Sequence, residues 1–474
     1  MARKAHDLPA VLSSNAQSQP PRRSGGPTSF RCRSDGRFIS LFHSCDVNNG
    51  EFRIASMFSA SPIANLKPNT LPFTNRSVLS RGILEADISG SLLRYIAKSS
   101  HVFSVRSFGA RANGLTDDSN AFSETWRMAC GSAGVVTFLI PKGTYLVGPV
   151  KFSGPCKNVS SLTVKMKGYL KASTDLSKYG SGAGWVEFRW MEGLTLTGGG
   201  TFDGRGAEAW PFNNCLDDHN CNLLPTNLKF VAMNNTVVRR ITSLNSKFFH
   251  LALVQCKGFR GSNLKISAPA NSPNTDGIHI DRSSNIHLSR SHIQTGDDCI
   301  SIGQGNSQVT ITGIDCGPGH GISVGSLGRY QNEGDVSGLV VKNCSLTGTT
   351  NGIRIKTWPN SPGSSSATNM TFKNFAMNNV SNPIIIDQSY CPFRSCSFKA
   401  PSLVKLSDIY FKNIKGTSSS KVAVALECSK GFPCQNVNLE NVHLLLSSGQ
   451  NHPSSTCKYV RAKYIGTQIP PPCA

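Results

Sequence analysis

Three short stretches of the sequence repeat one pattern: Asp276-Gly-Ile-His-Ile280, Asp298-Cys-Ile-Ser-Ile302 and His320-Gly-Ile-Ser-Val324. They begin 22 residues apart each time, and a fourth copy, Asn351-Gly-Ile-Arg-Ile355, follows after 31 residues. Short strands that recur every 20–30 residues or so are typical of a solenoid, in which each turn of the chain stacks on the next. Strands of adjacent turns lie about 4.8 Å apart. The repeat therefore predicts a parallel sheet, with the first residues of the copies in one column at its edge.

The chain beyond this repeat also favours stacked coils. From residue 135 to the C-terminus, β-branched and aliphatic runs alternate with Gly, Asn, Ser and Asp, and helical periodicity is almost absent. Asn-Gly hairpin turns are largely missing, so a parallel β-helix is favoured over a sandwich of hairpins. The runs expected to form strands are Val135–Ile140, Leu194–Thr197, Leu228–Val231, Leu251–Val254, Val309–Ile311, Leu339–Val341, Ile384–Ile386 and Val422–Leu426. The fold class is therefore all-β, with one β-helix domain.

One helix is expected ahead of the coils. Asp117-Asp-Ser-Asn-Ala-Phe-Ser-Glu-Thr-Trp126 begins with residues that favour a helix N-terminus, and Ala121, Phe122 and Trp126 form its apolar face. Such a helix would cap the first coil, whose core and strand edges would otherwise be exposed. Ordered sequence is expected from Val102, which gives a β-helix domain over residues 101–474.

The first 100 residues differ from the rest of the chain. Their opening is rich in Ser, Pro and Arg, as in Gln19-Pro-Pro-Arg-Arg-Ser-Gly-Gly26. We recognise no secretory signal there, because a basic start followed by an apolar run of about 7–15 residues is missing. We expect residues 1–100 to be a disordered basic segment. An organelle transit peptide and a mis-assigned N-terminus are both compatible with this composition.

Composition restricts the class of partner. The net charge is +22, from 49 Lys and Arg against 27 Asp and Glu. A basic surface suits nucleic acid, but the sequence shows no nucleic-acid-binding motif, and such a surface serves an acidic polysaccharide equally well. No stretch of 18 apolar residues occurs, so we expect no membrane span. The cysteines also lack the paired spacing of a zinc site.

The cysteines indicate an oxidising compartment. Fourteen of the 16 follow residue 125, and several form close pairs that we expect to be disulfides. These pairs are Cys215/Cys221, Cys299/Cys316, Cys391/Cys396, Cys428/Cys434 and Cys457/Cys473. Six glycosylation sequons, at Asn75, Asn158, Asn234, Asn343, Asn369 and Asn379, are compatible with secretion. We therefore expect an extracellular location, despite the atypical N-terminus.

The candidate chemistry lies in the repeated stretches. Asp276, Asp297 and Asp298 fall on two adjacent turns, and His320 falls on the next one. Glycosidic bond hydrolysis needs a proton donor for the leaving oxygen and a base for water, and crowded carboxylates can divide these tasks. Arg354 and Lys356 alternate along the fourth stretch and should point the same way, where they could bind an anionic substrate.

Each of these residues also has an ordinary structural explanation. Asp-Gly and Asn-Thr-Asp are common in turns, and a solenoid needs a turn in every coil. Arg354 and Lys356 could be solvated strand residues. Only the shared register of the acids and cations favours a site. From the residues alone, a hydrolase and a stacked scaffold therefore both remain open.

Four motifs resemble the signatures of the polygalacturonases, which are pectin-hydrolysing glycoside hydrolases. They are Asn274-Thr-Asp-Gly277, Gly296-Asp-Asp-Cys299, Gly319-His-Gly321 and Arg354-Ile-Lys356, in that order. The resemblance extends over roughly Phe103 to Cys473, and the stretch Ile384–Pro392 is most similar to the plant pollen-type, often exo-acting members. It implies a right-handed parallel β-helix that hydrolyses α-1,4-linked galacturonic acid with inversion.

The resemblance also implies a role for each site residue. Asp297 would be the general acid, Asp276 and Asp298 would activate water, and His320 would lie beside the acid. The substrate carboxylate would be bound by Arg354 and Lys356, and Asn274 would line the cleft. Residues 101–474 would then be a monomeric catalytic domain that needs no metal or cofactor and acts on acidic polysaccharide.

Three alternatives to an exo-acting hydrolase remain. An endo-acting polygalacturonase would differ only in the loops at the ends of the cleft. A pectate lyase would share the solenoid but need Ca²⁺ and give unsaturated products. An inactive pectin-binding wall protein would bind oligogalacturonate without forming new reducing ends, and the intact set of acids argues against it.

Overall fold

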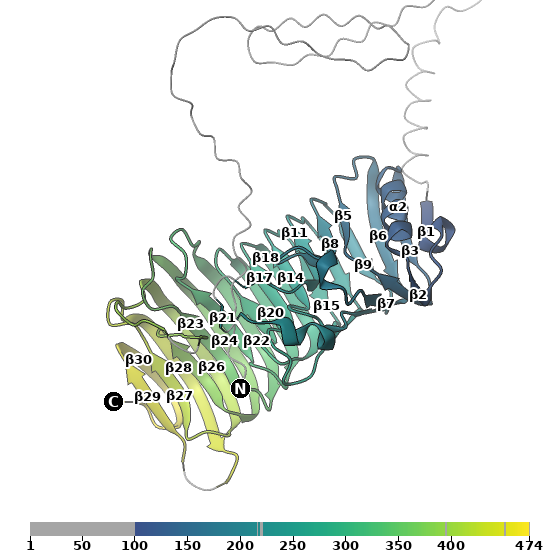
Figure 1. The fold of residues 1–474 in the computed structure, drawn as a ribbon. Helices are drawn as coiled ribbons and strands as arrows, with labels where there is room; N and C mark the ends of the chain where they lie inside the picture. Colours follow the sequence, from purple (N-terminus) through teal and green to yellow (C-terminus); the bar gives the residue numbers. More distant parts are fainter. Residues whose placement is uncertain (1–99, 216, 219–220, 394–395, 450–451, 474) are drawn as a thin grey trace, which may run out of the picture. The chain divides into compact units, whose positions relative to one another are not determined.

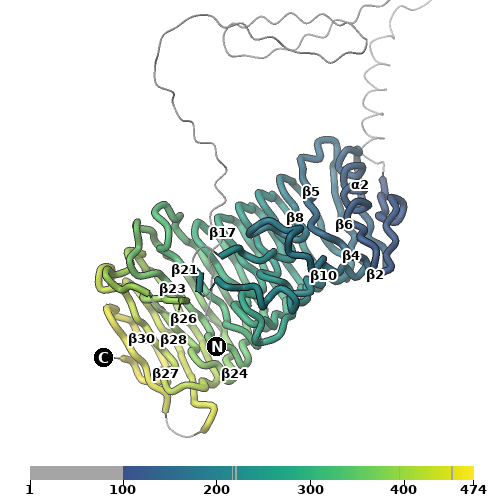
Figure 2. Tube along the Cα trace, in the orientation of Figure 1, coloured from purple at the N-terminus to yellow at the C-terminus, as the bar shows by residue number. Residues whose placement is uncertain are grey.

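The computed structural model describes residues 100–473 except for 216, 219–220, 394–395 and 450–451. Successive coils stack in chain order from β1 and helix α2 to β29 and β30, as Figures 1 and 2 show. This is the expected parallel β-helix. The expected disordered segment 1–100 lies outside the described residues, apart from its last residue, with which β1 begins.

One sheet carries the repeated stretches. It contains eleven strands, one from each successive coil, and every neighbouring pair is parallel. Its strands, in order, are β5 (Val150–Ser153), β8 (Gly184–Arg189), β11 (Thr226–Val231), β14 (Leu251–Val254), β17 (Ile278–Asp281), β19 (Ile300–Ile302), β21 (Ile322–Leu327), β23 (Asn351–Thr357), β25 (Asn382–Asp387), β27 (Val422–Glu427) and β29 (Ser454–Lys458). We call it the site sheet.

The other described strands form a nineteen-stranded sheet. They are β1 (Ser100–Ser104), β2 (Asn113–Asp117), β3 (Gly134–Ile140), β4 (Thr144–Val147), β6 (Val159–Met166), β7 (Tyr169–Ala172), β9 (Leu194–Thr197), β10 (Thr201–Asp203), β12 (Val237–Arg239), β13 (Thr242–Leu244), β15 (Arg260–Ser262), β16 (Lys265–Ser267), β18 (Ser284–Gln294), β20 (Ser307–Cys316), β22 (Val336–Thr347), β24 (Ser365–Val380), β26 (Val404–Ser418), β28 (Cys434–Leu446) and β30 (Val460–Ile469). Both β15 and β16 pair with β18, so two short strands of an early coil correspond to one long, bent strand in later coils.

The bend in the long strands is built from asparagines. Asn343, Asn374, Asn413 and Asn441 occupy it with φ between 53° and 58°, the left-handed region that Asn tolerates better than most residues. Their side-chain amides donate from coil to coil at 2.9, 3.0 and 3.2 Å. This ladder satisfies polar groups at a corner where no regular strand pairing is available.

The core is a set of columns inside the coils. Ile278, Ile300, Ile322 and Ile353 are in register on successive strands of the site sheet, and all four are fully buried. Each such side chain contributes roughly 1.5–3 kcal/mol by leaving water. The column therefore fixes the register of the turns that precede these strands.

Helix α2 (Ser119–Cys130) confirms the expected N-terminal cap and extends four residues beyond the predicted end. Its predicted apolar face is buried, and the Trp126 ring lies 4.8 Å from that of Phe152 on the first strand of the site sheet. Asp118 stands at the N-cap but bonds the preceding loop, accepting from the Arg111 and Ala112 amides at 2.7 and 3.1 Å. The other described helices are short 3₁₀ turns: η1 (Val105–Phe108), η2 (Leu176–Lys178), η3 (Gly206–Glu208) and η4 (Trp210–Phe212). Among the described residues, no helix has the length and apolarity needed to cross a membrane.

All five predicted cysteine pairs form disulfides. A sixth, Cys130–Cys156, ties the end of α2 to the loop before β6. Sequence reasoning missed it, because these two cysteines lie 26 residues apart. In the described part of the chain, Cys256 and Cys344 remain as free thiols, both buried.

Candidate active site

The repeated stretches align as the spacing predicts. Ile278 pairs with Ile300, Ile300 with Ile322 and Ile322 with Ile353, so the residues two positions earlier share one level of the sheet. Those residues are Asp276, Asp298, His320 and Asn351. Backbone bonds continue between these turns, from Gly277 N to Asp298 O at 2.9 Å and from Cys299 N to Gly321 O at 2.8 Å. The predicted column is confirmed.

The two adjacent acids lie in a tight turn before β19. A Cβ at Gly296 would stand 2.0 Å from the Ser272 carbonyl oxygen, so only glycine allows this turn to pack on the preceding coil. Asp298 then donates its backbone N–H to Asp297 Oδ1 at 2.5 Å. Asp297 and Asp298 are buried, as is Asp276 on the preceding coil. The chain thus concentrates three carboxyl groups at one place.

Two partners hold the Asp298 carboxyl group. Lys356 Nζ lies 3.0 Å from Oδ2, and Ser323 Oγ donates to Oδ1 at 2.8 Å. Both partners come from coils that follow the acid, and the Lys356 side chain is fully buried. A charge-assisted bond to an ammonium stabilises the negative charge of Asp298. Lys356, predicted to bind substrate, is therefore found bound to an acid of the site.

His320 lies beside Asp297. Its Nδ1 is 3.4 Å from Asp297 Oδ1, and its backbone N–H donates to the Asp297 carbonyl at 2.7 Å. Gly321 has φ 81°, and a Cβ there would stand 2.0 Å from the Asn351 carbonyl oxygen. Only glycine fits at position 321 without a clash. This close packing lets the His320 imidazole approach Asp297 from the next coil.

The predicted cations point to the same side of β23. The guanidinium carbon of Arg354 lies 4.8 Å from the centre of the Tyr390 ring, and Lys356 Nζ lies 5.2 Å from it. An aromatic face attracts cations at such distances. Arg354 Nη2 also lies 3.5 Å from Asp387 Oδ2. Tyr390 was not predicted as a site residue, although its position three residues after the strand partner of Lys356, Asp387, is a usable signal.

Asn274 connects the site to a distant part of the chain. Its backbone is left-handed, with φ 52°, and it is buried two residues before Asp276. It is not among the described residues that line the cleft described below, so its predicted place in the cleft stays a prediction. Its Oδ1 accepts a hydrogen bond from Asn213 Nδ2 at 2.9 Å. Asn213 was not predicted either, because it lies in an irregular segment 61 residues earlier.

A cleft of about 830 Å³ opens over this site. His320 and Arg354 both line it, so the acid side and the cationic side of the site share one hollow. The other lining residues are Ala270, Asn271, Gly296, Thr350, Asn351, Ser381, Asn382, Ile385, Tyr390, Cys391 and Pro392. An elongated anionic ligand could thus contact both groups at once.

The acids also have the chemistry of a cation site. Asp297, Asp298 and His320 each offer an atom within 4.8 Å of the others. The Lys356 ammonium already neutralises Asp298, so a divalent ion there would meet a positive charge at close range. Hydrolysis without a metal remains a prediction, which a chelator can test.

Comparison with known proteins places this geometry in a family. The sequence profile of the glycosyl hydrolases family 28 matches residues 130–466. An exopolygalacturonase of Platanus acerifolia is 48% identical over 377 residues, which is 80% of this chain and 99% of that protein. An exopolygalacturonase of Oenothera organensis is 48% identical over 76% of this chain and 98% of its own. A polygalacturonase of Gossypium barbadense is 44% identical over 78% and 90%.

Solved structures support the fold. The endo-xylogalacturonan hydrolase from Aspergillus tubingensis superposes with a TM-score of 0.65 at 24% identity, over 77% of this chain and all of that one. The hyperthermoactive exopolygalacturonase from Thermotoga maritima gives 0.62 at 20% identity, over 81% and 97%. The predicted right-handed parallel β-helix is thereby confirmed. The matched profile and the close relatives together show that this chain belongs to the glycosyl hydrolases family 28 and is a glycoside hydrolase.

Proposed function

We propose that this protein hydrolyses α-1,4-galacturonosidic bonds of polygalacturonate and pectin, with inversion and from the ends of the chains. The observation that carries this proposal is the placement of three buried acids and two cations in and under one cleft. Carboxyl side chains can catalyse the hydrolysis of a glycosidic bond, and cationic side chains bind sugars that carry a carboxylate. The names of the curated relatives, exopolygalacturonase above all, support the same substrate.

The acids divide into a proton donor and activators of water. Asp297 donates its proton to the leaving glycosidic oxygen, and His320, 3.4 Å away, orients that carboxyl group. Asp276 and Asp298 remove a proton from the water that attacks the anomeric carbon. Asp298 suits the second task, because Lys356 and Ser323 both stabilise its ionised form. The bond to the leaving oxygen breaks as the bond to water forms, and the base holds the released proton.

The cations bind the substrate. Arg354 lines the cleft and presents a planar guanidinium, which binds a carboxylate through two parallel hydrogen bonds. Lys356 is fully buried and holds Asp298, and from there it contributes its charge to the binding of the same carboxylate. Asn274, two residues before Asp276, supplies an amide to the sugar hydroxyls.

The stereochemistry of the first product gives a separate test of the roles assigned to the acids. Atoms of Asp297 and Asp298 lie within 4.8 Å of each other, closer than the roughly 6.5–9.5 Å typical of inverting acid pairs. A water molecule does not fit between carboxyl groups this close. For inversion, the attacking water must therefore lie to one side of Asp297 and Asp298, where Asp276 on the adjacent coil can also contact it. Proton NMR of the first product would show the inverted anomer, and the retained anomer would contradict these roles.

The compartment and assembly belong to the same proposal. Six disulfides and plant polygalacturonase relatives are consistent with an extracellular protein. We propose that it acts in the cell wall as a monomer, with polysaccharide as its partner. An endo-acting enzyme and an inactive pectin-binding protein are the alternatives that product analysis separates.

Replacing the proton donor tests the assignment. Asp297→Asn should lower the turnover of polygalacturonate by about 10²–10⁴-fold, because a general acid contributes that much. Binding of oligogalacturonate should persist, since Arg354 is unchanged. Asp315→Asn, which alters an acid of the nineteen-stranded sheet bonded to Ser345, is the matched control and should keep full activity. Substantial turnover by Asp297→Asn would refute the role given to Asp297.

A further inference from the structure

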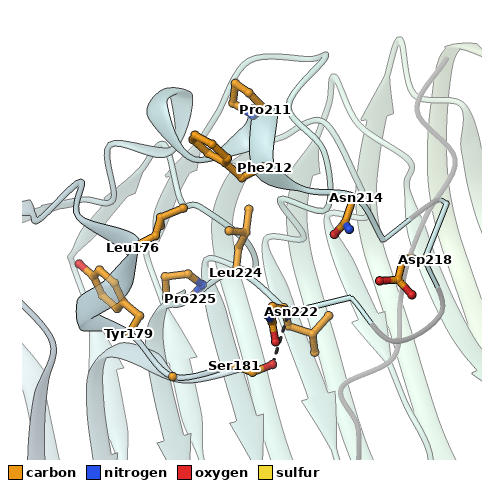
Figure 3. Close-up of a pocket in the computed structure, with 12 residues that line it drawn as sticks. Leu176, Tyr179, Ser181, Pro211, Phe212, Asn214, Asp218, Asn222, Leu224 and Pro225 are labelled. Atoms are coloured by element: carbon orange, nitrogen blue, oxygen red, sulfur yellow. Dashed lines mark hydrogen bonds between the residues drawn. The ribbon is translucent and has the colours of Figure 1, made fainter.

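A second hollow lies at the same edge of the site sheet as the acids. It has a volume of about 690 Å³, and Figure 3 shows the described residues that line it. Ser181 lies three residues before β8, and Pro225 directly precedes β11. Asp276 lies just before β17, which is two strands further along the same sheet. The coils of Pro225 and Asp276 are therefore roughly 10 Å apart.

Hydrogen bonds and a buried cluster hold the walls of this hollow together. Gly182 N donates to the Leu223 carbonyl at 3.1 Å, and Leu223 N donates to Ser181 Oγ at 3.3 Å. Leu223 and Leu224 also belong to a buried apolar cluster that includes Phe249. The hollow is therefore a preformed feature of the fold.

Phe212 gives the hollow an exposed aromatic surface. It is the last residue of η4, whose Trp210 is anchored by a hydrogen bond from Nε1 to the Ser246 carbonyl at 3.1 Å. Phe212 itself is 67% exposed, and Figure 3 shows its ring on the same hollow as Leu176 and Leu224. Exposed apolar surface of this kind is stabilised when a ligand covers it.

The polar groups of the lining suit hydroxyl groups. Ser181 contributes a hydroxyl, and Asn214 and Asn222 contribute amides, which both donate and accept hydrogen bonds. A sugar ring has the matching surface, with C–H groups on its faces for aromatic contact and hydroxyls around its rim. The volume is also within the range of about 300–1,000 Å³ that is usual for ligand sites. The lining thus has the chemistry of a sugar-binding site.

The charge of the lining favours a sugar without a carboxylate. The described lining contains the carboxyl group of Asp218 but no Lys, Arg or His. A galacturonate carboxylate there would meet an acid, with no cation in the described lining to offset it. The cleft differs, because Arg354 and His320 line it. The cleft therefore suits acidic sugar units, and the second hollow suits uncharged ones.

Two cations beside Tyr179, which also lines the second hollow, are engaged elsewhere. Lys178 Nζ lies 3.2 Å from Asp117 Oδ2. Lys247 is buried, lies 5.3 Å from the centre of the Tyr179 ring and donates to the Gly204 carbonyl. Neither cation belongs to the described lining, which supports its uncharged preference.

We propose that this hollow binds an uncharged sugar unit of pectin, separately from the cleft, with Phe212 as its stacking surface. The inference rests on the proposed function for the choice of polymer. Two sources supply such a unit: a methyl-esterified galacturonate of the backbone, and a neutral sugar of a side branch. Phe212 is a binding residue that takes no part in bond cleavage.

Calorimetric titration tests this site. The full chain carrying Asp297→Asn, which limits turnover, is titrated with a fully methyl-esterified galacturonate tetramer, with the same tetramer de-esterified, and with β-1,4-linked galactotetraose. At least one uncharged probe should bind, and adding Phe212→Ala should weaken that binding about tenfold, as expected for loss of an aromatic contact. The esterified tetramer alone would identify the backbone as the source, and galactotetraose alone would identify a side branch.

Further variants separate the hollow from the cleft. Phe212→Trp keeps an aromatic face and should keep the binding of the uncharged probe. Arg354→Ala should weaken the de-esterified tetramer alone. Phe398→Ala removes another exposed aromatic ring, 59% exposed and outside both described linings, and should leave all three affinities unchanged.

Three results would overturn the proposed site. They are no saturable binding of either uncharged probe, equal affinity with and without Phe212→Ala, and tighter binding of the de-esterified tetramer that depends on Phe212. The titrations do not depend on catalysis. A failure of the proposed function would instead appear as an absence of new reducing ends when the wild-type chain acts on polygalacturonate.

Discussion

Two irregular regions beside the site sheet are built alike but offer different chemistry. The early flank, residues 205–215 and 221–225, has an apolar cluster and the Cys215–Cys221 disulfide, and its contact with the coil of Asp276 is the neutral amide pair Asn213–Asn274. In the second region, Trp358, Tyr390 and Phe393 form an aromatic cluster beside the Cys391–Cys396 disulfide, and Tyr390 lines the cleft. We call this aromatic cluster the late flank. Its rings lie against the cations Arg329, Arg354 and Lys356.

This difference gives the site a direction. A β-helix repeats the same strand pairing in every coil, so its sheet alone does not distinguish the two ends of a bound polymer. The early flank meets the coil of Asp276 through neutral amides, whereas the late flank holds Arg354 and Lys356 against Tyr390. The solenoid thus aligns the acids, while the irregular segments make the two sides of the site chemically different.

The largest effect is expected at the late flank. Arg354→Ala should raise KM for de-esterified polygalacturonate about 30-fold or more, because loss of one partner of a buried charge pair costs about 2–5 kcal/mol. Its effect on methyl-esterified pectin should be much smaller, since that substrate has few carboxylates. Arg189→Ala, which removes a guanidinium paired with Glu187 at 2.7 Å on β8, is the control. Equal losses on both substrates would contradict a carboxylate clamp.

Removing the two disulfides in turn sharpens the comparison. They close loops of six and five residues, so each should contribute about 2 kcal/mol to the free energy of unfolding. We expect the double variants Cys215→Ser/Cys221→Ser and Cys391→Ser/Cys396→Ser to lose similar stability in urea denaturation. Their activities should differ: KM for polygalacturonate should rise in the second, which loosens the Tyr390 partner of Arg354, and stay near the wild-type value in the first. The same functional defect in both would mean that the flanks do not have separate roles.

The third effect concerns pH, and it is absent above about pH 6.5. His250 follows Phe249 of the apolar cluster and is fully buried. Burial lowers its pKa to about 3, despite a contact of 2.8 Å with Ser243 Oγ. An unfolded histidine has a pKa near 6.5, so the unfolded chain binds the extra proton first. Stability is therefore complete above about pH 6.5 and falls toward pH 3, by about 1.4 kcal/mol for each pH unit.

A variant isolates this contribution. His250→Asn should show a shallower loss of unfolding free energy between pH 6 and pH 4 than wild type, as measured by urea denaturation at each pH. The absolute stability of the variant is immaterial, because only the slopes are compared. Identical slopes would show that His250 does not carry the pH dependence.

Much of the site could be predicted from the sequence, because the strand register of stacked coils can be read from the spacing of residues along the chain. The 22-residue spacing of Asp276, Asp298 and His320 sufficed to place them in one column, since every coil pairs with the next at fixed levels. Alternation along β23 likewise placed Arg354 and Lys356 on one side. The ion pair of Lys356 with Asp298 was not predicted, because it joins residues two coils apart, and side-chain reach is not visible in spacing.

The irregular parts were not predictable in the same way. The early flank has neither strand alternation nor helical periodicity. Its small core combines Ala209, Cys215, Leu223 and Leu224 with Phe248, Phe249 and Ala252 from later in the chain. The Asn213–Asn274 contact depends on that packing. Cys130–Cys156 was missed for a related reason, as it joins the cap to a loop rather than closing a short turn.

The most direct test of the account is to incubate the full chain with polygalacturonate and a chelator, while measuring reducing ends, product size and ultraviolet absorbance. A metal-independent exo-hydrolase should form reducing ends and saturated monomer at a steady rate. Products formed only after Ca²⁺ is added, with the absorbance of an unsaturated sugar, would contradict hydrolysis by Asp276, Asp297 and Asp298. Binding without any new reducing ends would equally contradict it.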